Sequence, residues 1–182
     1  MIQAIGLVEF ISIAKGIEAA DAMLKAAQVS LLEAKPICPG KYIVLVCGDV
    51  AAVQSSVDTG RTCDAQAVID HFILPNVHPQ VIAAILAASP EIEVKALGII
   101  ETFSVASLIV AADTAAKAGN VALLEIRPGM GIGGKSFVTL TGDVSSVKSS
   151  VEAGAVSAGE KGMLVEKVVI PAPHPSLKQC VL

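Results

Sequence analysis

The second half of this 182-residue chain repeats the first half. The segment "AIGLVEFISIA" at residues 4–14 matches "ALGIIETFSVA" at 96–106, and each begins with an apolar run. At the same offset of 92 residues, "VSLLEAKP" at 29–36 matches "VALLEIRP" at 121–128. Segments with the same pattern of apolar and polar residues bury the same faces, so we expect the two halves to adopt the same fold.

The match continues after a short insertion in the second half. The segment "GKYIVLVCGDVAAVQSSVDTG" at 40–60 matches "GKSFVTLTGDVSSVKSSVEAG" at 134–154 with an offset of 94 residues. Farther on, "ILPNVHP" at 73–79 matches "VIPAPHP" at 169–175 with an offset of 96 residues. The first change of offset falls in a loop just after a proline. We therefore predict that the two halves differ most in this loop.

Hydrophobic periodicity predicts the same order of elements in each half. An apolar run at 4–10 precedes Ile13, Ile17, Ala20 and Leu24, whose spacing is typical of a helix. A strand, a loop, a second apolar strand, another helix and a last strand follow. The order β-α-β-β-α-β with an appended helical turn predicts an α/β (α+β) fold, with two tandem ferredoxin-like domains.

The boundaries of the domains and of their second helices follow from local signals. We predict a first domain at 1–88 and a second at 95–182, with "AASPEIEV" at 87–94 as the linker. Asp49 and Asp143 precede the second helix of each half and are well placed to cap it. Gly60 and Gly154 are predicted to end these helices.

Composition excludes two classes of partner and favours a third. Apolar residues make up 53% of the chain and charged residues 16%, with a net charge of −4 and no cluster of basic residues. We expect no binding to nucleic acid or to an anionic membrane. The longest stretch without Asp, Glu, Lys or Arg, at 71–90, contains three prolines, which argue against a membrane-spanning helix. No secretory signal is recognised at the start of the sequence, so we expect a soluble, cytoplasmic protein. A surface poor in charge predicts a tight oligomer.

One of the four cysteines has an unusual context. Cys38 lies in "PICPGK" at 36–41, where Pro36 and Pro39 are expected to hold it extended at the tip of a stiff, exposed turn. An exposed thiol in a rigid turn suits a ligand, a nucleophile or a disulfide partner. The cysteines form no CxxC pair, and the expected compartment argues against disulfides.

The other cysteines and the second loop carry weaker signals. Cys47 is expected to be a buried apolar residue, Cys63 to lie near a helix start, and Cys180 has no assigned partner. The loop "PGMGIGGK" at 128–135 resembles a phosphate-binding loop only superficially, because a strand and not a helix follows it. We interpret it as the wider counterpart of the Cys38 loop. His78 and His174 recur in "HP" and are expected to be structural, since no nucleophile or carboxylate recurs beside them.

These residues together carry a resemblance to a known family. "AIGLVE", "ADAMLKAAQVSLL", "GDVAAV" and the closing "P..HP" are similar to the shell domain of bacterial microcompartments, once in each half and over nearly the whole chain. Members with two such domains form trimers that imitate hexamers and tile a protein shell. The motif "ICPGK" further resembles the iron–sulfur-binding type found in propanediol-utilisation compartments.

The resemblance implies a function and a set of site residues. It implies a homotrimeric, non-enzymatic shell tile with one [4Fe-4S] cluster on the threefold axis, held by three copies of Cys38. Its use would be electron transfer across the shell or delivery of the cluster, with neighbouring shell proteins and an encapsulated redox enzyme as partners. The alternative is a passive tile whose pore admits small metabolites. Lys25 and Lys117 match the family's tile-edge lysine, whereas Asn76 and Ala172 replace its edge arginine. The implied pore-loop residues are Pro36, Ile37, Pro39, Gly40, Gly129, Met130, Gly131, Ile132, Gly133 and Gly134.

Overall fold

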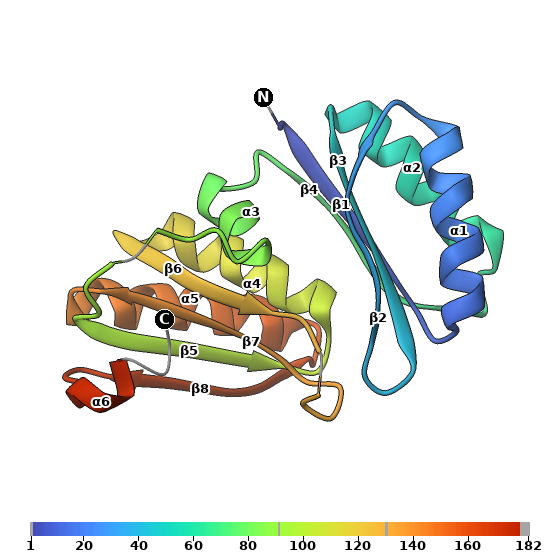
Figure 1. The fold of residues 1–182 in the computed structure, drawn as a ribbon. Coiled ribbons are helices and arrows are strands. Elements are labelled where there is room, and N and C mark those ends of the chain that lie inside the picture. The colour runs from blue at the N-terminus through green and yellow to red at the C-terminus, as the bar shows by residue number, and fades with distance from the viewer. Residues whose placement is uncertain (1, 91, 130, 179–182) are drawn as a thin grey trace. The chain divides into compact units, whose positions relative to one another are not determined.

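The computed structural model describes residues 2–90, 92–129 and 131–178, which form two compact units, Met1–Val77 and His78–Leu182 (Figure 1). The first unit contains β1 (Ala4–Phe10), α1 (Ile13–Ala26), β2 (Ser30–Ile37), β3 (Lys41–Gly48), α2 (Val50–Cys63) and β4 (Val68–Pro75). The second contains α3 (Pro79–Ile85), β5 (Ala96–Thr102), α4 (Val105–Ala118), β6 (Val121–Arg127), β7 (Ser136–Gly142), α5 (Val144–Glu160), β8 (Leu164–Ile170) and α6 (Pro175–Lys178). The predicted element order is confirmed in both halves.

Each unit has a four-stranded antiparallel sheet with two helices on one face (Figure 1). The strand order is β2-β3-β1-β4 in the first sheet and β6-β7-β5-β8 in the second, which is the ferredoxin-like order. The irregularities in register also recur, since the shift between Leu31 and Glu33 has its counterpart between Leu123 and Glu125. The repeat in the sequence is thus a repeat in detailed backbone geometry.

The core of each unit lies between its sheet and its helices. In the first unit Val8 and Phe10 of β1 pack with Met23 of α1 and Val57 of α2, and all four are fully buried. Burying side chains of this size contributes roughly 1.5–3 kcal/mol each. The helices approach the sheet so closely that a Cβ at Gly6 would lie 2.5 Å from Val57 Cγ2. The equivalent glycine of β5 is equally crowded.

Side-chain caps start three of the four long helices. The Ser12 and Ser104 hydroxyls accept hydrogen bonds from the backbone N–H groups of Lys15 and Ser107. The predicted cap at Asp49 is confirmed, because its carboxylate accepts from the N–H of Ala52 at 2.8 Å. The cap predicted at Asp143 is wrong in its chemistry. Asp143 occupies the N-cap position of α5 but makes no capping bond, and its carboxylate lies 3.6 Å from Lys95 Nζ.

The glycines expected to end the second helices lie inside them. Helix α2 continues to Cys63 and α5 to Glu160. A Cβ at Gly60 would lie 2.6 Å from Met23 Sδ, and one at Gly154 would lie 2.7 Å from a backbone oxygen of α4. These glycines are therefore needed for close helix packing and not for termination. The extension of α2 also places Cys63 at a helix end, so the predicted position near a helix start is wrong.

Helix α3 follows the first repeat in sequence but belongs to the second unit. Its Val81, Ala84 and Ile85 are buried, and it packs on β6 and α4 (Figure 1). The compact units consequently divide after Val77, whereas the repeat itself suggested a boundary at residue 88. None of the helices in the described ranges is both long enough and apolar enough to cross a membrane.

Candidate functional site

The Cys38 loop is a short hairpin connection between β2 and β3. Ile37 is the last residue of β2 and is 5% exposed, which anchors the base of the turn. Cys38 is half-buried, Pro39 and Gly40 are exposed, and the Cys38–Pro39 peptide bond is cis. Pro36 lies in β2, an edge strand, where the missing N–H of proline is tolerated. The structure therefore places Cys38 within the turn itself, and the residue is less exposed than expected.

The equivalent loop between β6 and β7 is longer and richer in glycine. Gly131, Gly133 and Gly134 have φ angles of 72°, 66° and 82°, a region that favours glycine. The Gly129 N–H donates to the Ser136 hydroxyl at 3.2 Å across the base of the loop. Met130, predicted to be in the same loop, lies outside the described residues. The predicted contrast between a stiff short loop and a wide loop thus has a backbone basis.

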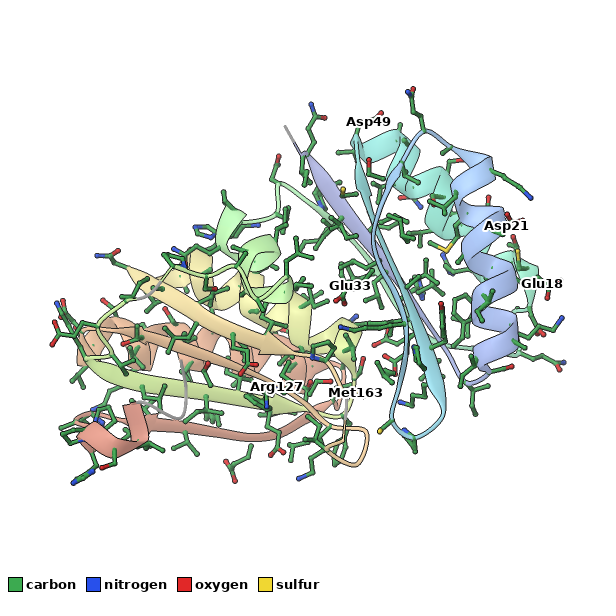
Figure 2. All side chains as sticks on the ribbon, in the orientation of Figure 1. Glu18, Asp21, Glu33, Asp49, Arg127 and Met163 are labelled. Carbon is green, nitrogen blue, oxygen red and sulfur yellow. The ribbon has the colours of Figure 1, made fainter. Side chains whose placement is uncertain are left out.

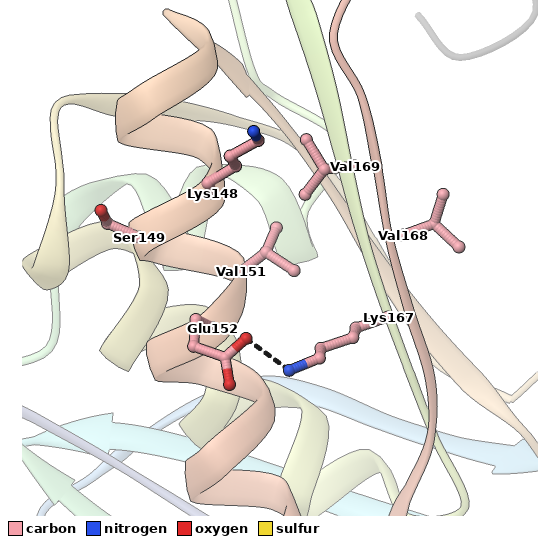
Figure 3. A pocket seen from close by; sticks show the side chains of 7 residues that line it. All are labelled: Lys148, Ser149, Val151, Glu152, Lys167, Val168 and Val169. Carbon is pink, nitrogen blue, oxygen red and sulfur yellow. Dashed lines mark hydrogen bonds and ion pairs between the residues drawn. The ribbon is translucent and has the colours of Figure 1, made fainter.

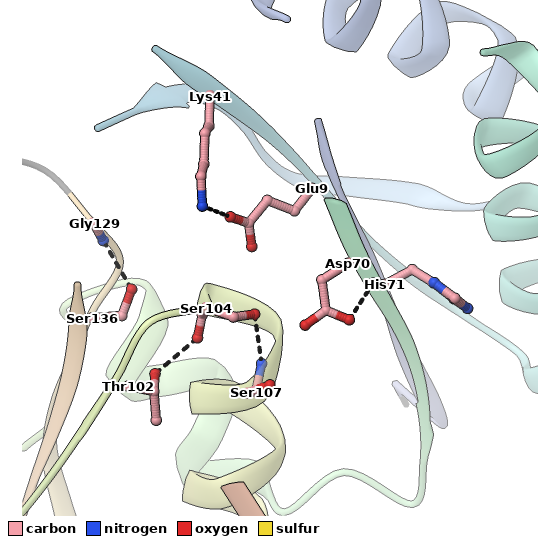
Figure 4. A network of polar contacts seen from close by, with 9 residues as sticks. All are labelled: Glu9, Lys41, Asp70, His71, Thr102, Ser104, Ser107, Gly129 and Ser136. Atoms are coloured by element: carbon pink, nitrogen blue, oxygen red, sulfur yellow. Dashed lines mark hydrogen bonds and ion pairs between the residues drawn. The ribbon is translucent and has the colours of Figure 1, made fainter. Parts of the chain in front are cut away.

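A lysine–glutamate ion pair lies at the base of each loop. Lys41 Nζ lies 2.8 Å from a carboxylate oxygen of Glu9 (Figure 4). In the second unit, Lys135 Nζ lies 3.1 Å from a carboxylate oxygen of Glu101. The Glu9 side chain is only 1% exposed, and its second oxygen has no hydrogen-bond partner among the described residues. Sequence reasoning missed this pair. The available signal was a glutamate within an apolar strand that recurs in both halves.

The described cysteines differ in their suitability as thiolate ligands. Burial raises the pKa of the Cys47 thiol above its ordinary value, which keeps this group protonated and confirms its expected place in the core. Cys63 is exposed at the end of α2. Cys180 lies outside the described residues. Within the described part of one chain, no group of three or more Cys, His, Asp or Glu side chains is arranged to hold a metal ion.

An iron–sulfur cluster normally takes four thiolates, so the donor set decides whether this chain fits one. The sulfur chemistry of Cys38 fits, and its position in an anchored turn suits a ligand. One chain nevertheless offers one such thiol, and the site is complete only if several copies bring their turns together.

The two lysines matched to the tile edge have different environments. Lys117 Nζ lies 2.6 Å from Asp113, whose side chain is 4% exposed. Lys25 pairs with Asp21 at 2.5 Å, but these side chains are 74% and 64% exposed, and Asp21 is seen on the outside of α1 (Figure 2). Among the histidines of "HP", His78 precedes α3 and His174 precedes α6. Their positions agree with a structural role.

Surface grooves recur at the same place in both units. One of about 560 Å³ lies between α5 and β8, where Lys167 pairs with Glu152 across the groove (Figure 3). The other, of about 520 Å³, lies between α2 and β4 and includes Asp58 and His71. Because both grooves follow a helix and an edge strand of the same fold, we interpret them as a property of the fold.

Comparisons with known proteins agree with this architecture. The model of the BMC domain matches residues 4–77 and 96–173, once in each unit's sheet-and-helix body. The bacterial microcompartment shell protein PduT of Citrobacter freundii is 49% identical over 177 residues, which are 97% of this chain and 96% of that protein. The shell protein EutM of Salmonella typhimurium is 40% identical over 85 residues, 47% of this chain and 86% of that protein. The chain therefore belongs to the BMC-domain family of bacterial microcompartment shell proteins.

Solved structures lead to the same family. The crystal structure of a microcompartments protein from Desulfitobacterium hafniense DCB is 74% identical, with a TM-score of 0.92, and the match covers 99% of this chain and 100% of that one. The fused permuted hexameric shell protein MSM0275 of the RMM microcompartment is 18% identical with a TM-score of 0.65, over 86% of this chain and 83% of that one, and shows the fold alone. The predicted family, fold class and shell location are confirmed. The relatives named here are shell proteins, in agreement with the expected non-enzymatic role.

Proposed function

We propose that three copies of this chain form a ring-shaped trimer that serves as one shell tile, and that three Cys38 thiolates hold a [4Fe-4S] cluster on its threefold axis. The tile would support electron transfer across the shell or delivery of the cluster to an enclosed redox enzyme. Neighbouring shell proteins would contact its outer edges, at Lys25 and Lys117.

The observation that carries the trimer is a difference in exposure between equivalent helices. Ile13 and Ile17 of α1 are 41% and 54% exposed, whereas their counterparts on α4, Val105 and Ile109, are each 2% exposed. These two apolar residues of α1 are therefore uncovered, although they repeat with helical spacing. Apolar stripes of this kind mark interaction surfaces.

The sheets show the opposite difference. Phe72 of β4 is 6% exposed, while its counterpart Val168 of β8 is 42% exposed. Leu7 of β1 is fully buried, and its counterpart Ile99 of β5 is half-buried. One domain thus has an open helix face and the other an open sheet face. Two different faces that meet between copies make a heterologous contact, which closes into a ring when the rotation permits. With two domains per chain, three copies supply the six domains of a tile.

The cluster proposal is supported by the chemistry and position of Cys38. Ile37 is buried beneath the turn, and the two prolines restrict the backbone on either side of the thiol. Cys47 is a poorer ligand because its thiol is buried and its pKa is raised. When bound, an iron–sulfur cluster takes up and releases single electrons. Three copies of Cys38 supply three ligands, which leaves one iron for water, a small molecule or a partner's side chain.

Iron analysis of single-cysteine variants tests this proposal. Anaerobically reconstituted wild-type protein is expected to bind about four irons per three chains. Cys38→Ser should lose iron, sulfide and the electron paramagnetic resonance signal of the reduced cluster, because a neutral hydroxyl replaces the thiolate. Cys63→Ser is the matched control, since it removes an exposed thiol elsewhere and should keep the cluster. Analytical ultracentrifugation of both variants should still show trimers. A Cys38→Ser protein that keeps its cluster would contradict the assignment.

A passive tile with a central pore is the second candidate. The wide loop favours it, because a Cβ built at Gly131 or Gly133 would have no atom within 4 Å, so the backbone there borders open space. In this case, anaerobic reconstitution would yield a colourless trimer for the wild type and for Cys38→Ser alike. Absorbance near 400 nm in the wild type alone supports the cluster instead.

A further inference from the structure

Helix α3 shows how the closing segment of one repeat docks on a domain. The backbone N–H of His78, just before the helix, donates to Asp113 Oδ1 at 2.7 Å. The other oxygen of Asp113 pairs with Lys117 at 2.6 Å, and the Asp113 side chain is 4% exposed. Val81, which begins the apolar side of α3, is fully buried. An aspartate on α4 and an apolar residue of α3 together hold the segment in place.

The same segment also covers a sheet edge. Gln80 accepts from the N–H of Leu123 at 2.8 Å and donates to the carbonyl of Val121 at 3.4 Å, both on β6. Strand β6 is at the edge of its sheet, and unpaired edge groups otherwise face solvent or another chain. Docking of α3 therefore combines a charge-assisted hydrogen bond, a buried apolar side chain and an edge cap.

The first unit has the equivalent docking surface, and its residues are exposed in the part of the chain that the structure describes. At the repeat offset of 92 residues, Asp21 and Lys25 of α1 correspond to Asp113 and Lys117. The side chain of Asp21 is 64% exposed, although Asp113 is buried, and Asp21 lies on the outer surface of α1 (Figure 2). Leu31 of β2, the counterpart of Leu123, is 44% exposed where Leu123 is 2% exposed.

The end of the second unit carries the matching segment. Helix α6 begins at Pro175 just after His174, as α3 begins at Pro79 just after His78, and the first turns share a backbone hydrogen bond. Leu177 N–H donates to the His174 carbonyl at 2.9 Å, the distance found between Val81 N–H and the His78 carbonyl. Leu177 is nevertheless 38% exposed, whereas Val81 is fully buried.

We propose that α6 of one copy docks onto α1 and β2 of a second copy of this chain. The N–H of His174 would donate to Asp21, and Leu177 would take the buried position that Val81 has on the second unit. Ser176 stands where α3 has Gln80 and is too short to span both edge groups, so this intermolecular contact is weaker than the α3 contact. The inference rests on the proposed self-association and names one contact within it.

Sedimentation equilibrium of the full-length chain tests the contact. Asp21→Ala and Leu177→Ser should each raise the dissociation constant of one such contact about tenfold, the usual loss for one charge-assisted hydrogen bond or one buried aliphatic anchor. A ring of three chains contains this contact three times, so the trimer as a whole should be weakened by more than this. Asp21→Asn keeps an acceptor and should have a smaller effect. The double variant Asp21→Ala/Leu177→Ser should weaken assembly less than the product of its single effects, because both residues act in one contact.

Matched controls separate this contact from general effects on folding. Glu18→Ala removes another exposed acid of α1, and Val156→Ser removes another exposed apolar side chain, 53% exposed on α5. Both controls should assemble like the wild type. Hydrogen exchange should show protected amides at residues 174, 176 and 177 in the assembled wild type, and this protection should be lost in Asp21→Ala. If Asp21→Ala and Leu177→Ser form trimers as stable as those of the wild type, the proposed docking of α6 is wrong. The proposed tile is not affected by that result. A wild-type monomer at micromolar concentration overturns both.

Discussion

Helices α1 and α4 occupy the same place in two copies of one fold, yet their surroundings differ. Ten residues of α4 are buried and four of α1. Ile17 on α1 and Ile109 on α4 are the same residue type at equivalent positions, with exposures of 54% and 2%. The repeated sequence determines how each domain packs internally. It does not determine what covers each domain, and the uncovered helix is the one that we assign to assembly.

The ion pairs at the base of the two loops should show the largest difference in stability between the two units. Glu9→Gln should lower the free energy of unfolding by about 2 kcal/mol, because it leaves the amine of Lys41 with a neutral partner in a site where that side chain is 19% exposed. Glu101→Gln should cost less than about 1 kcal/mol, since its partner Lys135 is 42% exposed and well solvated. Urea unfolding monitored by circular dichroism measures both. Equal losses for the two variants would show that the pairs are equivalent in energy.

The tile-edge lysines provide a second comparison with a smaller expected effect. Lys117→Ala should destabilise the chain by about 1–2 kcal/mol, because it removes the cation beside the buried carboxylate of Asp113. Lys25→Ala should cost no more than about 0.5 kcal/mol, since its partner Asp21 is exposed. Thermal unfolding at low protein concentration checks the prediction. If Lys25→Ala proved the more harmful, the burial of Asp113 would not determine which of the two ion pairs stabilises the chain more.

Two equivalent serines give the smallest effect. The Ser56 hydroxyl donates to the carbonyl of Met23 at 3.0 Å, whereas the buried Ser150 hydroxyl has no hydrogen-bond partner among the described residues. Ser56→Ala should therefore cost about 1 kcal/mol, and Ser150→Ala should change stability by less than about 0.5 kcal/mol. Denaturant titrations of both variants under the same conditions measure the two changes in the free energy of unfolding. A larger loss at Ser150 would mean that its hydroxyl is bonded after all.

Much of the fold could be predicted from the sequence because the repeat supplied each pattern twice. The element order, the cap at Asp49 and the burial of Cys47 followed from local periodicity and capping rules. The ends of α2 and α5 could not be predicted in this way. Gly60 and Gly154 look like helix terminators, but their actual role is to let α1 and α4 approach, which depends on contacts distant in sequence.

The candidate site could be predicted only in part. The contrast between the loops at Cys38 and Gly131 could be predicted from their prolines and glycines. The ion pair of Glu9 and Lys41 could not be predicted in this way, because it joins residues on different strands. The apolar stripe of α1 shows a further limit. A helix that binds a second molecule has the same hydrophobic periodicity as a helix that packs in a core. The sequence therefore predicted the helix but did not predict that its apolar residues are exposed. The roles of Cys38 and of the edge lysines stay predictions.

The backbone of the wide loop also affects how this protein can evolve. Gly131 and Gly133 have left-handed conformations, and the space around each would admit a side chain. Asparagine and aspartate tolerate that conformation better than other residues. Single substitutions to these two types could thus add polar groups to the loop without any repacking of the domain. The turn at Cys38 has one such position, Gly40, so the second loop offers more sites at which a lineage of such shell proteins can acquire new chemistry.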